Sequence, residues 1–226
     1  VFSDYMKPAI RLAAIMRLPV MFIFTHDSLY VGEDGPTHQP VEQFAGLRAV
    51  PQLEVWRPGD AQENAAVLAR ILARTDGPSV LALTRQKIPV YAKHDSAWRE
   101  SIARGAYVVK ESKGRPKLVI VATGSEVSLA LETVRVLKRD DIRIVSMPCR
   151  ERFLAGTPAQ REELLPNGVR RVVIEAGVAM GWESVAGPDG LLICMNDFGI
   201  SGPSERVAEH FGFHPDAIAR KIRALA

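Results

Sequence analysis

The sequence predicts an α/β protein with two domains, each a parallel-sheet α/β sandwich. Short continuous apolar runs, typical of strands buried on both faces, alternate with segments whose apolar residues recur at helical spacing. This order implies parallel pairing with right-handed crossovers. The alternation stops between residues 87 and 117, where prolines and charges are frequent, and then starts again. The 226 residues suffice for two modest cores, and we place the domains at residues 1–90 and 117–226, with a linker at residues 91–116.

Local patterns justify each element of the first domain. Apolar residues recur with helical spacing over Phe2–Arg17, and Pro8 should lie in the first turn of the regular helix. Pro19 then precedes Val20–Phe24, a continuous apolar run that predicts a buried strand. Asp60 is expected to cap the helix that follows it. A helix, a strand, a second helix and a second strand are predicted at Val41–Leu47, Leu53–Trp56, Ala61–Ala73 and Ser79–Leu83.

The second domain repeats this order after one short β-like patch, Ala106–Val109, in the linker. The run Lys117–Thr123 predicts a strand, and Gly124-Ser125-Glu126 follows it. We interpret this isolated tripeptide as the start of a helix rather than as a phosphate-binding turn. Further strands are predicted at Ile142–Met147, Val172–Ile174 and Leu191–Met195, and helices at Ser204–Phe211 and Pro215–Leu225.

The composition excludes several classes of protein. Apolar residues make up 47% and charged residues 24% of the chain, which argues against disorder. The net charge of +3 comes without a basic stripe interleaved with aromatics, so we expect no nucleic-acid partner. No apolar run reaches the roughly 18 residues of a membrane span and no signal segment opens the chain, so we expect no membrane partner and a cytoplasmic location. Cys149 and Cys194 lie far apart, in or beside apolar runs, and are expected to be buried and reduced.

One loop concentrates the polar chemistry. Residues 25–40 hold two histidines, three carboxylates and two glycines directly after an apolar run. Ligands of parallel sheets bind beyond the carboxyl ends of the strands, so we expect a rigid loop that presents His26, Asp34 and His38 to a site. Imidazole and carboxylate suit proton transfer, hydroxyl recognition or metal binding, and residue type does not separate these uses. The alternative is a solvated loop whose Asp and Thr side chains cap the next helix.

Residues 26–40 read His-Asp-Ser-x-x-x-Gly-Glu-Asp-Gly-Pro-Thr-His-Gln-Pro, which resembles the signature of the transketolases. The resemblance extends over the chain: Phe2–Arg85 is similar to the later part of the family's pyrimidine-binding domain, and Lys117–Ala226 to its C-terminal domain. Deoxyxylulose phosphate synthases and pyruvate dehydrogenase β chains share the architecture but not the loop, whereas dihydroxyacetone synthases share most of the loop. The resemblance implies transfer of a two-carbon ketol unit between phosphorylated sugars in the pentose phosphate pathway.

The resemblance also implies roles for individual residues. His26 and Arg85 would hold the sugar phosphate, Asp34 a donor hydroxyl, and His38 the oxygens near the reacting carbon. A guanidinium after a strand suits phosphate because it is planar and always charged. Without the family, His26 would be interpreted as a histidine bonded to backbone and Arg85 as a surface ion-pair former. We expect Asp27 and Glu33 to brace the loop rather than contact substrate.

The implied cofactor is thiamine diphosphate with Mg²⁺ or Ca²⁺, in a homodimer. Phe2 and Tyr5 match aromatic positions around the aminopyrimidine ring, although by pattern alone they would be the buried face of a helix. The family's catalytic glutamate and its metal-binding domain would precede Val1, where the chain starts without Met inside a helical pattern. We therefore expect a piece of a longer protein that is inactive alone. Leu29-Tyr30 replace the usual Ile-Gly, which adds bulk beside the site.

Three other interpretations stay open. The chain could be a dihydroxyacetone synthase, which shares most of the loop. It could be a non-catalytic or scaffold subunit of a split transketolase, whose C-terminal domain stabilises the assembly. It could also be a metal-dependent hydrolase that uses His26, Asp34 and His38 as ligands, although a third imidazole is missing nearby.

Overall fold

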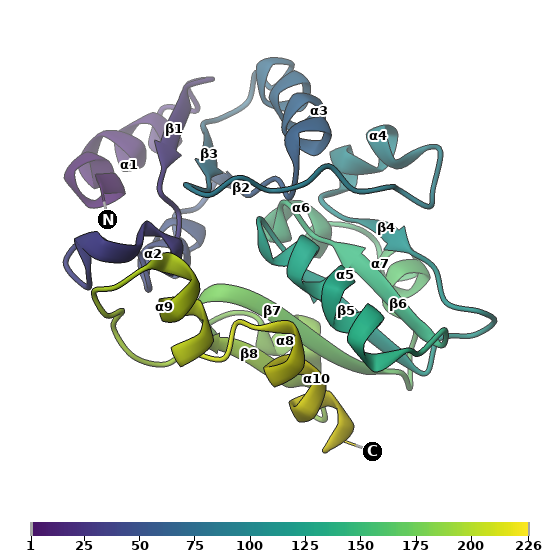
Figure 1. Cartoon of the computed structure of the whole chain (residues 1–226). Helices are drawn as coiled ribbons and strands as arrows, with labels where there is room; N and C mark the ends of the chain where they lie inside the picture. Colours follow the sequence, from purple (N-terminus) through teal and green to yellow (C-terminus); the bar gives the residue numbers. More distant parts are fainter. Residues whose placement is uncertain (1, 226) are drawn as a thin grey trace.

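The computed structural model describes residues 2–225, without the side chain of Phe2. It consists of two neighbouring α/β units, each built on one sheet (Figure 1). The first sheet has three parallel strands in the order β1-β3-β2. They are β1 (Met21–Thr25), β2 (Glu54–Trp56) and β3 (Ser79–Leu83). All three expected strands of this domain are present, within one residue of their predicted bounds.

The helices around the first sheet follow the predicted pattern. Pro8 lies in the first turn of α1 (Lys7–Ile15), as predicted, and the residues before this helix form a 3-10 turn, η1 (Phe2–Met6). Asp60 caps α3 (Ala61–Leu72), because its side chain accepts a hydrogen bond from the Glu63 amide at 2.8 Å. The other two elements are α2 (Gln43–Arg48) and the 3-10 segment η2 (Leu29–Asp34).

The second sheet has five strands in the order β4-β6-β5-β7-β8. They are β4 (Tyr107–Lys110), β5 (Leu118–Ala122), β6 (Ile142–Ser146), β7 (Arg170–Val178) and β8 (Leu191–Met195). The pairing is parallel except at β4, which runs antiparallel to β6, so the β-like patch of the connecting segment completes this sheet. Strand β7 runs well past the predicted Val172–Ile174 and includes a buried carboxylate, Glu175.

Helices cover both faces of the second sheet. Strand β5 alternates between them: Leu118 and Ile120 pack in one cluster with helices α5, α9 and α10, whereas Val119 and Val121 pack in another with α6, α7 and α8. The helices are α5 (Glu126–Leu137), α6 (Arg150–Leu154), α7 (Pro158–Leu164), α8 (Glu183–Ala186), α9 (Ser204–His210) and α10 (Pro215–Arg223), and the connecting segment adds α4 (Trp98–Ser101) and η3 (Ile102–Arg104). None of the described helices is long and apolar enough to cross a membrane.

The two sheets share their largest hydrophobic cluster. The largest buried cluster joins Leu29, Trp56 and Leu81 of the first region to Ile144 and Ile218 of the second. The two sheets therefore pack against each other across this cluster, and each sheet has a further buried cluster of its own.

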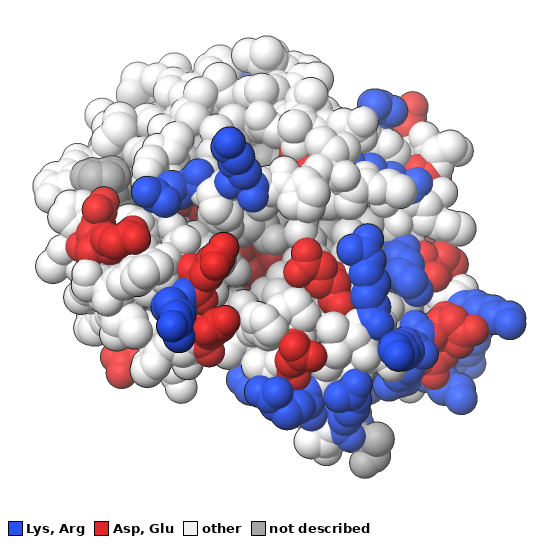
Figure 2. Space-filling view, viewed as in Figure 1, with Lys and Arg blue, Asp and Glu red and all other residues white. Residues whose placement is uncertain are grey.

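The outer face of α1 and β1 remains apolar and open. The expected buried face of α1 is buried at Ile10, whereas Met16 is 58% exposed. Figure 2 shows that charged side chains are sparse on the upper, α1 and β1, part of the molecule and that Lys and Arg gather lower down. Exposed large apolar residues of this face are Tyr5, Leu12, Ile15, Met16 and Ile23.

Candidate active site

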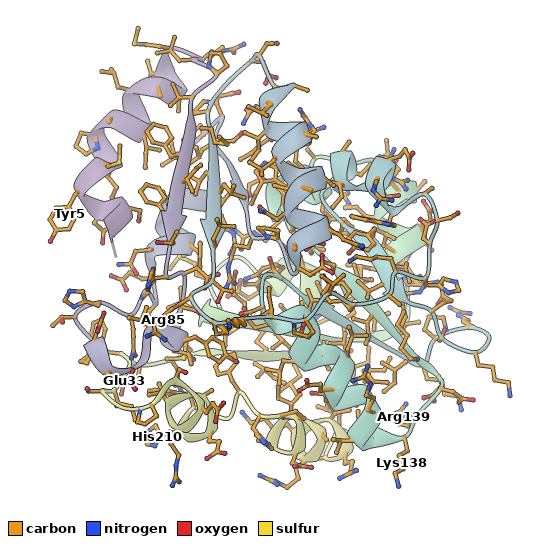
Figure 3. All side chains as sticks on the ribbon, turned by 45° about the horizontal axis from the view of Figure 1, so that its top comes forward. Tyr5, Glu33, Arg85, Lys138, Arg139 and His210 are labelled. Carbon is orange, nitrogen blue, oxygen red and sulfur yellow. The ribbon has the colours of Figure 1, made fainter. Side chains whose placement is uncertain are left out.

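The candidate site lies at the carboxyl edge of the first sheet. Strands β1 and β3 pair in parallel, with Thr25 opposite Leu83. His26 follows β1 at once and Arg85 lies two residues past β3, so both leave the sheet at one edge. Figure 3 shows Arg85 at the same end of the sheet as Glu33, which lies in the loop after β1. The topology thus brings together residues that are 59 positions apart in the sequence.

His26 has an unusual backbone conformation. Its φ is +65°, in the left-handed region that residues other than glycine rarely adopt. Its ring is half-buried, and Nδ1 lies 2.9 Å from the Thr25 hydroxyl. Such conformations persist where the surrounding structure fixes them and are frequent at functional sites. The next residue, Asp27, is buried and provides that fixation.

Asp34 and His38 lie on the loop of residues 26–40, called here the site loop. Gly32 (φ +79°, ψ −118°) and Gly35 (φ +76°, ψ −167°) adopt conformations open almost exclusively to glycine, which fixes the turn around Asp34. Asp34 and His38 are exposed, and His38 Nδ1 lies 2.9 Å from the Thr37 hydroxyl. Helix α2 begins without a side-chain cap, so the site loop does not act as its cap.

Arg85 is exposed after β3, beside a hydrogen bond between Thr84 and Gln86. Among residues 2–225 no carboxylate forms an ion pair with Arg85, so it is not a surface ion-pair former within this part of the chain. Its hydrogen-bond donors therefore face solvent at the edge where His26 leaves the sheet.

A buried ionic network supports the site loop from below, and the sequence did not reveal it. Arg57, at the end of β2, is fully buried and pairs with Asp27 at 2.8 Å and with Glu126 and Glu175 at 3.0 Å each. Arg48 pairs with Glu175 at 2.7 Å. The signals that could have found it are charged residues just after strands and a carboxylate inside the apolar run of β7.

The pKa of each glutamate in this network depends on how closely the two arginines surround it. Burial alone would raise the pKa of Glu175, but Arg48 and Arg57 beside it and the Trp182 indole N–H lower that pKa to about 2. Burial raises the pKa of Glu126 in spite of its pairing with Arg57. Asp27 braces the site loop, as expected from the sequence, because it pairs with the Arg57 guanidinium. The same guanidinium pairs with Glu175 in β7 of the second sheet.

The two residues that depart from the usual loop wording turn into the core. Leu29 is fully buried, and the Tyr30 ring packs partly buried against the core shared by the two sheets. Burial and the nearby carboxylates of Glu126 and Asp27 raise the pKa of the Tyr30 hydroxyl well above its ordinary value. The added bulk of Tyr30 thus fills space beneath the site loop.

Tyr5 is the described one of the two aromatic residues expected around the aminopyrimidine ring. It is 82% exposed, points away from the first helical turns in Figure 3, and is therefore not part of a buried helix face. The side chain of Phe2 lies outside the described part of the chain. A cavity between β1 and α2, lined by Phe24, Phe44 and His26 among others, adjoins the site.

Neither a metal cluster nor a reactive cysteine was found in the described residues. Between residues 2 and 225 no group of three His, Cys, Asp or Glu side chains is placed to hold a metal ion. In this part of the chain the hydrolase interpretation, which needs His26, Asp34 and His38 as ligands, therefore lacks its ligand cluster. Cys149 is buried and Cys194 half-buried, both unpaired, and burial raises the pKa of Cys194 to about 12.

Fold and site together define an α/β protein with two sheets and a polar site at the carboxyl edge of a parallel sheet. Two family comparisons specify it further. Residues 1–90 match the transketolase pyrimidine-binding domain, and residues 105–214 match the transketolase-like C-terminal domain. These matches cover most of the chain, which belongs to the transketolase family.

Individual relatives agree with this membership. The chain is 46% identical to the transketolase of Geobacillus stearothermophilus over 100% of its length and 34% of that protein, and 48% identical to transketolase 2 of Xanthobacter flavus over 99% and 33%. The solved transketolase structure from Leishmania mexicana superposes with a TM-score of 0.92 at 41% identity, covering 99% of this chain and 32% of that one. The chain thus spans about a third of the length of these transketolases.

Proposed function

We propose that this chain forms the sugar-phosphate-binding part of a transketolase, which transfers a two-carbon ketol unit from a ketose phosphate to an aldose phosphate. The observation that carries the proposal is the register of β1 with β3, because it sets His26 and Arg85 at one sheet edge beside the loop with Asp34. Membership of the transketolase family supports the same reaction.

In this proposal Arg85 binds the substrate phosphate. A guanidinium donates two parallel hydrogen bonds to a phosphate, and its charge does not depend on pH near neutrality. His26 adds a hydrogen bond to the phosphate or to a substrate hydroxyl from the adjacent strand end. The backbone strain at His26 supports this role, because it aims the ring from a fixed turn.

Asp34 and His38 act on the other end of the sugar. The Asp34 carboxylate accepts a hydrogen bond from a donor hydroxyl, and the wrong epimer leaves that carboxylate without a partner, which selects configuration. The His38 imidazole contacts the oxygens beside the reacting carbon, where it can accept or donate a proton near neutral pH. His38 is therefore the proposed catalytic residue of this chain.

Thiamine diphosphate supplies the chemistry that stabilises a carbanion. Tyr5, and in the same proposal Phe2, would stack on its aminopyrimidine ring. In the same proposal the catalytic glutamate and the ligands of Mg²⁺ or Ca²⁺ come from another part of the protein, so the isolated chain is expected to be inactive. We extend the proposal to a cytoplasmic homodimer that acts in the pentose phosphate pathway.

The test is substitution of Arg85 in the full-length protein, assayed for ketol transfer with thiamine diphosphate and Mg²⁺. Arg85→Ala should raise the KM for a ketose phosphate by about tenfold or more, since a hydrogen bond to a charged group contributes about 1.5–3 kcal/mol. The KM for a non-phosphorylated ketose should stay unchanged. Arg220→Ala, an exposed arginine of α10, is the matched control.

Equal losses with both ketoses would refute the phosphate-binding role of Arg85. Absence of ketol transfer by the unmodified full-length protein would refute the proposed function as a whole.

A further inference from the structure

One connection of the second sheet lies directly against the site loop. This connection, called here the β8–α9 loop, covers residues 196–203. The side-chain amide of Gln39 donates one hydrogen bond to the Gly32 carbonyl at 2.7 Å and another to the Ile200 carbonyl at 2.9 Å. A single buried amide thus ties the end of the site loop to its middle and to the β8–α9 loop.

A second contact meets the site loop next to its carboxylate. The Ser201 hydroxyl donates a hydrogen bond to the backbone carbonyl of Glu33 at 2.6 Å, one residue before Asp34. Helix α9, which follows the β8–α9 loop, packs along η2 of the site loop. Figure 3 shows His210 of α9 on the same side of the molecule as Glu33.

The packing leaves no room for added atoms at this contact. A Cβ on Gly199 would lie 1.5 Å from Gln39 Oε1, and a Cβ on Gly35 would lie 3.3 Å from the Ser201 Cβ. Beyond the site loop, the Val178 amide of β7 donates a hydrogen bond to the Val41 carbonyl at 2.9 Å. The second half of the site loop is therefore held by the β8–α9 loop, and the residue that follows the site loop is held by β7.

From these contacts we infer that the β8–α9 loop positions Asp34 and His38, and that Gln39 and Ser201 are its positioning residues. The inference rests on the proposed function for its catalytic consequence. Asp34 is exposed, so its place is determined by the backbone that carries it. Gln39 and Ser201 determine where that backbone lies, which gives the C-terminal domain a role in donor recognition without any contact to substrate.

Two substitutions in the full-length protein test the inference. Ser201→Ala removes one hydrogen bond, and Gly199→Ala forces Gln39 from its place. We expect faster hydrogen–deuterium exchange of the amides of residues 32–39 in both. For the ketose donor, we expect a KM increase of about fivefold for Ser201→Ala, as one hydrogen bond predicts, and up to about a hundredfold loss of kcat/KM for Gly199→Ala.

Each variant has a matched control in the same domain. Ser184 also donates its hydroxyl to a backbone carbonyl, that of Gly181, but lies on α8. An added Cβ on Gly202 meets only Val207 Cγ2, at 3.7 Å. Ser184→Ala and Gly202→Ala should leave both the exchange of residues 32–39 and the donor KM unchanged, with kcat also unchanged.

The two readouts separate this inference from the proposed function. Unchanged exchange of residues 32–39 in Ser201→Ala, or an unchanged donor KM in spite of faster exchange, overturns the inference. Unchanged ketol transfer in Asp34→Ala contradicts the proposed function. Faster exchange together with a raised donor KM, at nearly constant kcat for Ser201→Ala, supports the positioning role.

Discussion

Two sets of charged side chains near the site loop differ in burial. The set that supports the loop, described as below it, is buried, and the set that would face a ligand, described as above it, is exposed. Below, Asp27, Arg57 and Glu126 are buried, and each is paired. Above, Asp34 and Arg85 are exposed. Asp27 and Asp34, one from each set, lie on the same short stretch of chain after β1. The difference indicates that the support is built before any ligand arrives, while the binding groups keep their hydrogen-bonding capacity for a ligand.

The energetics of the two sets differ in the same way. Removal of one partner from a buried ion pair leaves an uncompensated charge and costs about 3–5 kcal/mol, whereas exposed charges contribute about 0–1 kcal/mol. The buried set also makes a cation–π contact, because the Arg57 guanidinium lies 4.4 Å from the Phe44 ring centre. Substitutions in the buried, paired set should therefore affect stability. Substitutions of the exposed Asp34 and Arg85 should affect binding.

The largest effect is expected for Arg57→Met. Three carboxylates, those of Asp27, Glu126 and Glu175, would lose their shared cation in a buried place. We expect the free energy of unfolding, measured by chemical denaturation, to fall by about 3–5 kcal/mol.

The control for this variant is Arg139→Met, which breaks a partly exposed pair with Asp141 and should cost less than about 1 kcal/mol. Equal costs for the two variants would show that burial does not distinguish the support from the surface.

Glu63 should give a pH effect of intermediate size on stability. It is a buried carboxylate with no cation paired to it in the described residues. Burial raises the pKa of Glu63 from an ordinary 4.5 to about 7, against a hydrogen bond from Ser146 across the two layers. Between these values the folded state holds a proton that the unfolded state has released. The stabilisation is therefore full below pH 4.5 and is lost as the pH rises to 7.

Glu63→Gln should remove this dependence. The difference in unfolding free energy between the variant and the unmodified protein should grow in favour of the variant by about 3 kcal/mol from pH 4.5 to pH 7, at about 1.4 kcal/mol per unit of pKa shift. Parallel stability curves for the two proteins across this range would mean that Glu63 is ionised in the fold.

The smallest stability effect is expected above the site loop. Asp34→Ala changes an exposed side chain, so the free energy of unfolding should stay within about 0.5 kcal/mol of the original value. In the full-length protein the KM for the ketose donor should rise by about tenfold. A large loss of stability without a change in KM would place Asp34 with the support instead of the site.

Much of the fold could be predicted because apolar periodicity is local. The strands Ser79–Leu83 and Leu191–Met195 have the predicted bounds, since each is a continuous apolar run. Helices α6 and α8 were missed because five and four residues do not complete a visible apolar period. The capping box of α7, in which Thr157 and Gln160 bond to each other's backbone, was a local signal that could have been used.

The supporting network could not be predicted, for a physical reason. The partners of Arg57 are separated from it by 30, 69 and 118 positions in the sequence, and only the fold brings them together. Glu175 even interrupts the apolar run of β7, which made the predicted strand too short. By contrast, the site loop was found because its polar residues are contiguous. The assigned roles of His26, Asp34, His38 and Arg85 stay predictions.

The core shared by the two layers restricts how this chain can change over evolution. Leu29 and Trp56 on one side lie in the same buried cluster as Ile144 and Ile218 on the other, and protein interiors are close-packed. A recombination event that joined the first half of this chain to the second half of a distant relative would bring together interior surfaces that were never matched. The two halves are therefore expected to be inherited as a pair, with compensating substitutions accumulating across their boundary.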